Sequence, residues 1–150
     1  MRKPDDAKYR DMIVQNLDVS MLVEAGAGSG KTTSLVNRMV ALIAAGKCNV
    51  DKMAAVTFTR KAAAELKGRF QIALEEAFHS EKNADRKARY EAALSSLEHL
   101  FAGTIHSFCA RLLRERPIEA KLDPDFEELE EDENLVLRAV SYTHLRAHET

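Results

Sequence analysis

The chain of 150 residues is long enough for about one globular domain, and its composition, 45% hydrophobic and 31% charged, is typical of a folded protein. Its formal net charge of −2 excludes a globally basic nucleic-acid-binding protein but leaves room for a local basic groove. No apolar run is long enough to cross a membrane, and the start, MRKPDDAKYR, lacks the apolar segment of a signal peptide. We therefore expect a cytoplasmic protein with no membrane partner and with reduced thiols at Cys48 and Cys109.

The spacing of the apolar residues predicts an alternation of helices and strands. In chain order, the expected elements are a helix over 5–17, a strand over 19–24, a helix over 31–46, a strand over 53–58, a helix from 59, a helix over 85–100, a strand over 102–105, a helix over 106–114 and the first turns of a helix over 134–138. The strand over 19–24 is expected to be buried on both faces, and the strand over 53–58 to be buried as well. The helix from 59 is expected to carry an apolar stripe on one side, formed by Leu66, Phe70, Ala73, Leu74 and Ala77. This alternation is typical of an α/β fold in which helices flank a parallel sheet.

A glycine-rich turn, AGAGSGKTT, joins the first expected strand to the helix that follows it. Strand, tight turn and helix form the context of a phosphate-binding loop. Its glycines let several backbone N–H groups point into one concavity, and the N-terminal end of the helix adds positive potential. We expect Lys31 to bind the β- and γ-phosphates of a nucleotide and Thr32 to hold Mg²⁺. The candidate nucleotide-binding residues are Ala25, Gly26, Ala27, Gly28, Ser29, Gly30, Lys31, Thr32 and Thr33.

An ordinary glycine-rich turn is the alternative for this segment, because Ala25 stands where the strict motif has glycine.

The end of one helix and the start of the next are expected from local chemistry. Gly46 is a suitable residue to end the helix from Lys31, and Thr57 or Thr59 can cap the next helix.

The helix from 59 carries an unusual basic cluster in its first half. Basic side chains near a helix N-terminus oppose the helix dipole, so this placement indicates an anionic partner. A solvated charged face is the alternative explanation. The members of the cluster are Arg60, Lys61, Lys67 and Arg69.

The end of the chain departs from this pattern. Residues 123–133 are strongly acidic, so Asp132 and Glu133 are expected to form a solvated face rather than a catalytic acidic pair. Residues 140–150, VSYTHLRAHET, follow the in-frame translation of a common sequencing adapter and are expected to be an artefact, a native polar tail being the alternative. We therefore expect the native reading frame to be interrupted near Arg138 and the chain to be the front of a longer protein.

Three motifs occur together in a characteristic order: AGAGSGKTT at 25–33, TFTRKAAAELKGR at 57–69 and GTIHSFC at 103–109. They resemble the N-terminal ATPase domain of the UvrD/Rep-type superfamily 1 DNA helicases. The segment RERPIEAKLDPDFEELEEDE looks closest to the RecB/AddA-like helicase–nuclease subunits. The resemblance covers about residues 10–138.

This resemblance implies an incomplete RecA-like P-loop NTPase fold. Residues 1–114 would be the N-terminal part of the ATP-binding domain, with 85–100 as an inserted helix. Residues 115–138 would begin an inserted helical subdomain, and 139–150 would be the adapter-derived artefact.

The resemblance also implies a role for individual residues. Lys31 and Thr32 would be catalytic, with ATP and Mg²⁺ as cofactors and Thr32 as the metal ligand. By spacing, Arg10 occupies the position where the family commonly has a glutamine that reads adenine, so adenine selectivity is open. The implied contacts to single-stranded DNA are Thr57, Thr59, Arg60, Thr104 and His106.

The implied function is the N-terminal segment of an ATP-dependent DNA helicase with 3′→5′ polarity, acting in repair or recombination. Its expected partners are single-stranded DNA or DNA ends and a second helicase–nuclease subunit. We expect the 150 residues on their own to be inactive, because a water-positioning acid and an arginine finger are missing. The alternatives are another P-loop NTPase, such as a kinase, and a non-catalytic remnant that binds single-stranded DNA.

Overall fold

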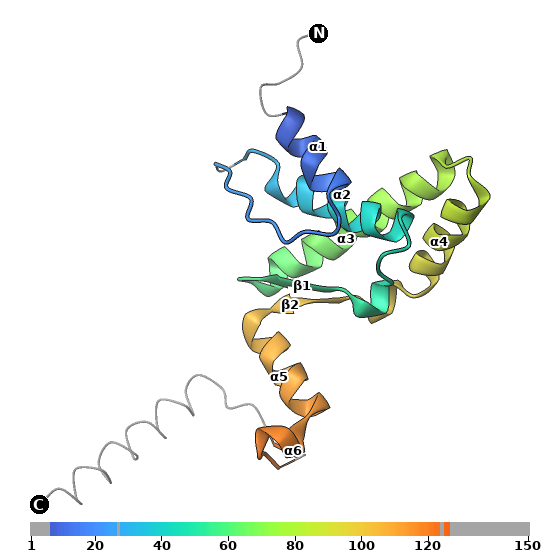
Figure 1. Cartoon of the computed structure of the whole chain (residues 1–150). Coiled ribbons are helices and arrows are strands. Elements are labelled where there is room, and N and C mark those ends of the chain that lie inside the picture. Colours follow the sequence, from blue (N-terminus) through green and yellow to red (C-terminus); the bar gives the residue numbers. More distant parts are fainter. Residues whose placement is uncertain (1–6, 27, 124, 127–150) are drawn as a thin grey trace, which may run out of the picture. The chain divides into compact units, whose positions relative to one another are not determined.

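The computed structural model describes residues 7–26, 28–123 and 125–126. The chain divides into two compact units, Met1–Phe108 and Cys109–Thr150, and each is described by itself. Helices are labelled α, short 3₁₀ helices η and strands β (Figure 1). In chain order they are α1 (Ala7–Gln15), α2 (Lys31–Ala44), η1 (Val50–Lys52), β1 (Ala54–Thr57), α3 (Arg60–Ser80), α4 (Ala84–Ser95), η2 (Leu97–His99), β2 (Phe101–Thr104), α5 (Ile105–Glu115) and α6 (Pro117–Ala120).

Among the described residues of the first unit, the sheet has two parallel strands, β1 and β2. Because α3 and α4 lie between these strands in the sequence, the connection is a helical crossover, as a parallel pair requires. In β1, Ala55 is buried whereas Ala54 and Val56 are exposed. The prediction that the strand over 53–58 is buried throughout is therefore wrong for one face, because α3 packs against the sheet and the face bearing Ala54 and Val56 stays open.

The core of this unit is centred on α3. Leu66, Phe70 and Leu74 recur every four residues, so they form one apolar stripe along the helix. Phe70 and Leu74 are completely buried. The remaining buried members of the same cluster are Val36, Met39, Ile43, Val50, Met53, Ala55, Tyr90, Ala93 and Leu100. The stripe expected from the sequence is therefore the surface onto which α2, α4 and the sheet pack.

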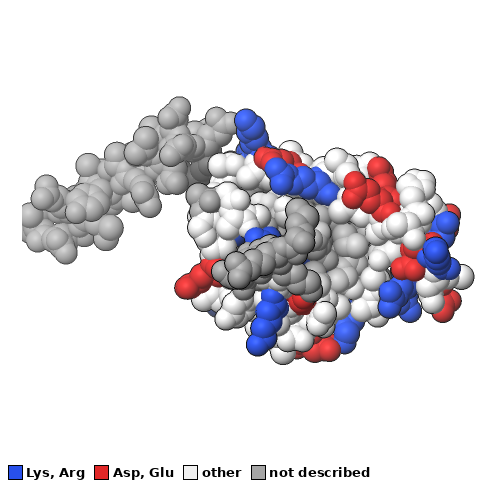
Figure 2. All heavy atoms as spheres, turned by 90° about the horizontal axis from the view of Figure 1, so that it is seen from above, with Lys and Arg blue, Asp and Glu red and all other residues white. Residues whose placement is uncertain are grey.

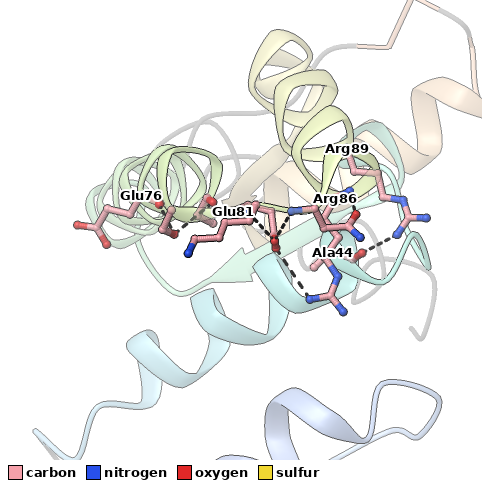
Figure 3. A network of polar contacts seen from close by, with 9 residues as sticks. Ala44, Glu76, Glu81, Arg86 and Arg89 are labelled. Atoms are coloured by element: carbon pink, nitrogen blue, oxygen red, sulfur yellow. Dashed lines mark hydrogen bonds and ion pairs between the residues drawn. The ribbon is translucent and has the colours of Figure 1, made fainter.

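The turn from α3 to α4 is stabilised by one carboxylate. Glu81 accepts hydrogen bonds from the backbone N–H groups of Lys82 and Asn83, each at 2.9 Å (Figure 3). The Asn83 bond, followed by the Lys82 bond and the charge of Arg86, lowers the pKa of Glu81. Asn83 in turn caps α4 by accepting from the Arg86 N–H at 3.0 Å.

The C-terminal end of α2 is held by α4. Gly46 has φ 67°, in the left-handed region, and therefore ends the helix as predicted. Arg89 donates to the carbonyl of Ala44 at 2.6 Å and so satisfies one of the unpaired carbonyls of the last turn (Figure 3). A Cβ at position 46 would lie 3.1 Å from the Arg89 guanidinium carbon, so the close approach of Arg89 to α2 also depends on the absence of a side chain at Gly46.

The prediction of a buried strand over 19–24 is wrong. The described residues from 16 to 26 form no strand, and Leu22 is 87% exposed while Val19 is 50% exposed. An apolar strand is stabilised by hydrogen bonds to a neighbouring strand and by cover on its faces. Among the described residues β1 and β2 pair with each other, whereas the segment 19–24 has no neighbouring strand to bond to and no cover on both faces.

The second unit contains the end of α5 and the short helix α6. Arg114 lies over the ring of Phe126, 5.3 Å from its centroid. The helix expected over 134–138, the acidic pair Asp132 and Glu133 and the expected artefact over 140–150 lie outside the described residues. None of the helices that the structure describes is long and apolar enough to span a bilayer.

Candidate functional site

The glycine-rich loop contains two glycines in the left-handed region of backbone conformation. Gly28 and Gly30 have φ 74° and 85°, a region that residues with a side chain rarely adopt. Gly30 is the N-cap residue of α2 and supplies no side-chain cap. The first N–H groups of α2 therefore have no side-chain acceptor at the cap, and an anion can take that place.

Lys31 lies across this loop. Its ammonium donates to the carbonyl of Ala25 at 2.6 Å and to that of Gly26 at 2.9 Å. The Ser29 hydroxyl donates to the Gly26 carbonyl at 2.7 Å, which closes the turn from inside. An ammonium has three donors, so Lys31 keeps one for a bound phosphate while its side chain stays exposed.

Thr32 and Thr33 follow in the first turn of α2 and are exposed. Within the described part of the chain, the Thr32 hydroxyl makes no hydrogen bond, so it is available as a ligand. The described residues also contain no cluster of three or more His, Cys, Asp or Glu side chains that could hold a metal. Mg²⁺ is commonly bound by only one or two protein groups together with phosphate and water oxygens, so a single hydroxyl at Thr32 is compatible with such a site. Ala27 lies outside the described residues.

Arg38 of α2 anchors the chain that leads into the loop. Its guanidinium donates to the carbonyls of Ile13, Asn16 and Val19 at 2.6, 2.9 and 2.9 Å. The first two carbonyls belong to the last turn of α1 and its end, where intrahelical partners are missing. Sequence reasoning missed this residue, although a lone arginine among the apolar residues of α2 was a visible signal.

A second group of candidates meets at the carboxyl end of the sheet. Thr57 and Thr104 are direct partners in the parallel register of β1 and β2. The Thr57 hydroxyl donates to the carbonyl of Thr59 at 2.9 Å. The Thr59 hydroxyl accepts from the Ala62 N–H at 3.1 Å and caps α3, so the predicted helix start is confirmed.

We expect the substitution Thr59→Ala to lower the free energy of unfolding by about 1 kcal/mol, because the Ala62 N–H then loses its acceptor. Thr59→Ser keeps the hydroxyl and should retain most of the stability. Urea unfolding followed by circular dichroism measures both variants. Equal stability of the alanine variant and the wild type would show that the cap is not important.

Thr104 begins the turn into α5. Its hydroxyl oxygen accepts from the Ser107 N–H at 3.3 Å, and its carbonyl accepts from the Ser107 hydroxyl at 2.9 Å. A Cβ at Gly103 would lie 2.7 Å from the Ser107 hydroxyl and 2.8 Å from the Phe101 ring, so a side chain there would displace both groups. His106 lies in the first turn of α5 and is exposed. All the predicted DNA contacts thus lie where β1 and β2 end and α3 and α5 begin: Thr57, Thr59, Arg60, Thr104 and His106.

Phe58 is a second residue of the candidate site that sequence reasoning missed. Its side chain is 102% exposed between Thr57 and Thr59, whereas a phenylalanine at the end of an apolar strand is normally buried. Ile105, which follows β2, is 58% exposed. The edge therefore offers an aromatic face beside hydroxyl groups, which is a surface suited to a stacked base.

The basic cluster of α3 is only partly neutralised. Arg69 pairs with Glu65 at 2.6 Å, so its charge is offset within the helix. Arg60 and Lys61 are exposed and make no ion pair within the described part of the chain. On the face shown in Figure 2, basic and acidic side chains are interspersed, in keeping with the net charge of −2. Any anion-binding surface at Arg60 and Lys61 is therefore local.

Comparison with known proteins assigns the family. The UvrD/REP helicase N-terminal domain matches residues 7–149. The chain belongs to this family. The helicase resemblance of the three motifs is thereby confirmed.

Three similar proteins are named as ATP-dependent helicase/nuclease subunits. The protein of Enterococcus faecalis is 35% identical over 130 residues, which cover 86% of this chain. The protein of Ligilactobacillus salivarius is 37% identical over 124 residues, which cover 83% of this chain. The protein of Desulforudis audaxviator is 43% identical over 121 residues, which cover 79% of this chain. The chain spans about 10% of the length of each relative.

Proposed function

We propose that the chain is the N-terminal segment of an ATP-dependent DNA helicase that binds ATP–Mg²⁺ at the loop and single-stranded DNA at the sheet edge. The observation that carries the proposal is the position of Lys31, whose ammonium crosses a glycine-rich loop at the start of α2. Membership of a helicase family supports the same assignment. We also infer that the described α/β unit is part of a RecA-like domain.

At the loop, the chemistry is charge neutralisation and positioning. Lys31 would contact the β- and γ-phosphates, the first N–H groups of α2 would bind phosphate oxygens, and Thr32 would complete a Mg²⁺ shell. The residues of this cradle are Ala25, Gly26, Ala27, Gly28, Ser29, Gly30, Lys31, Thr32 and Thr33.

At the sheet edge, the chemistry is that of a strand-binding groove. Arg60 and the threonine hydroxyls would contact the phosphate backbone, and Phe58 would stack on a base. In the whole protein, ATP would bind between two such domains, whose opening and closing moves the strand. An arginine finger supplied from elsewhere in that protein would raise the rate by about 10³–10⁵. Polarity of 3′→5′ and a second helicase–nuclease subunit remain part of this proposal.

The test of the DNA site is a pair of substitutions measured with a fluorescent oligo-dT strand. We expect Phe58→Ala to weaken binding by about 1–3 kcal/mol, because one stacked base loses its platform. Arg60→Ala should reduce the salt dependence of log K by about 0.7, the contribution of one phosphate contact.

Two matched variants serve as controls for these measurements. Ile72→Ala removes an exposed apolar side chain of α3 away from the sheet edge, and Arg69→Ala removes an arginine that is already paired with Glu65. Both should bind the strand like the wild type. If all four variants bind equally well, the edge is not the DNA site. If DNA does not stimulate nucleotide turnover in the longer protein, another P-loop enzyme such as a kinase becomes the better assignment.

A further inference from the structure

We propose that Arg10 is a positioning residue that orients the phosphate-binding loop and does not read the nucleotide base. This inference rests on the proposed nucleotide site and assigns a role within it. Arg10 lies on α1, and its guanidinium donates to the carbonyl of Ser29 at 2.9 Å. The same guanidinium lies 3.3 Å from the place where a Cβ of Gly30 would be. Arg10 is therefore packed against the last turn of the loop.

The helix that carries Arg10 is itself held in place. Arg38 of α2 binds the carbonyls of Ile13 and Asn16 at the C-terminal end of α1. Arg10 lies three residues before Ile13, so its position is set by the same anchored turn. The two arginines thus connect α2 to α1 and α1 back to the loop that begins α2.

The effect of Arg10 on the loop follows from peptide geometry. The Ser29 carbonyl and the Gly30 N–H belong to one planar trans peptide, so they point in opposite directions. A carbonyl held toward Arg10 turns the Gly30 N–H away from Arg10, which leaves that donor for an anion. Gly30 has no side chain and adopts φ 85°, so this peptide would otherwise rotate easily.

The donor set of Arg10 also argues against adenine recognition. Adenine presents an amino donor beside a ring-nitrogen acceptor, so reading both needs a group that accepts and donates, as the glutamine amide does. A guanidinium has only donors. Arg10 can hold a carbonyl, as it does at Ser29, but it cannot replace the glutamine of the family at the base.

The experiment compares three ligands with Mg²⁺ present: ATP, GTP and inorganic tripolyphosphate, which has no base. We expect Arg10→Ala to weaken binding of all three by the same factor, about tenfold, because a charge-assisted bond to the loop is lost. Arg10→Lys keeps a positively charged donor group at this position and should recover most of the affinity. Lys8→Ala removes a neighbouring exposed charge of α1 and should leave binding unchanged. Isothermal titration measures affinity, and thermal unfolding of each variant verifies that it is folded.

The other outcomes distinguish the positioning role of Arg10 from base recognition, from long-range electrostatics and from failure of the nucleotide site itself. A loss for ATP but not for tripolyphosphate would show that Arg10 contacts the base and would overturn the inference. Equal losses of affinity in Arg10→Ala and Lys8→Ala would show that the effect comes from long-range electrostatics rather than from the contact with Ser29, and would overturn the inference as well. If the wild type binds ATP through Lys31 and Arg10→Ala binds equally well, only the role of Arg10 fails. If the wild type binds none of the three ligands, the proposed nucleotide site fails and this inference fails with it.

Discussion

Replacing Lys31 with alanine is expected to weaken ATP–Mg²⁺ binding by about 100-fold, which corresponds to about 2.8 kcal/mol. The ammonium lies across the described part of the loop, with contacts to the carbonyls of Ala25 and Gly26. Its removal deletes a charge-assisted bond to phosphate, worth about 1.5–3 kcal/mol, and also loosens the loop that the lysine holds.

Titration calorimetry of the wild type, Lys31→Ala and Lys61→Ala measures this effect. Lys61 is an exposed lysine in the first turn of α3, so its substitution changes the net charge equally without touching the loop. We expect the Lys61 variant to bind ATP like the wild type. Undiminished affinity in Lys31→Ala would mean that the loop is an ordinary glycine-rich turn, and the nucleotide site would have to be sought elsewhere.

Replacing Phe70 with alanine is expected to cost about 3–5 kcal/mol of stability. The ring is completely buried in the middle of α3 and belongs to the core formed with α2, α4 and β1. The substitution removes the apolar contacts of the ring and leaves a cavity in the core cluster that joins these elements among the described residues. A loss of this size is comparable to the total stability of a small domain, so much of the variant should be unfolded at room temperature.

Urea unfolding followed by circular dichroism tests this expectation. Ile72→Ala is the matched control, because Ile72 lies two residues farther along α3 and is 57% exposed. Its free energy of unfolding should stay within about 0.5 kcal/mol of the wild type. Phe70→Leu, which removes less volume, should fall between the two and remain measurable if the alanine variant does not fold. A Phe70→Ala variant as stable as Ile72→Ala would contradict the assigned core.

The local features of this protein were predictable from the sequence, because each depends on neighbouring residues alone. The four-residue spacing of Leu66, Phe70 and Leu74 predicted the buried stripe of α3, and the structure confirms it. The capping role of Thr59 and the helix end at Gly46 follow from side-chain and backbone chemistry within one turn. The three motifs predicted the helicase family, which the comparisons confirm.

Other features were decided by tertiary structure. The segment over 19–24 is apolar enough for a strand, but a strand also needs a partner for its backbone, and the described residues supply none there. The exposure of Phe58 depends on where β1 ends and which face α3 covers, neither of which its neighbours in the sequence specify.

The same distinction applies to the candidate site. The sequence by itself determined which residues are candidates: the glycine-rich loop with Lys31 and Thr32, and the threonines and basic residues of the other two motifs. Only the tertiary structure decided that Thr57 lies opposite Thr104 and that Arg10 contacts the Ser29 carbonyl. These pairs are separated by 47 and 19 positions in the chain, and their contact depends on strand register and on the packing of α1 against α2. Local sequence patterns encode the chemistry of each group, whereas long-range packing sets which groups meet.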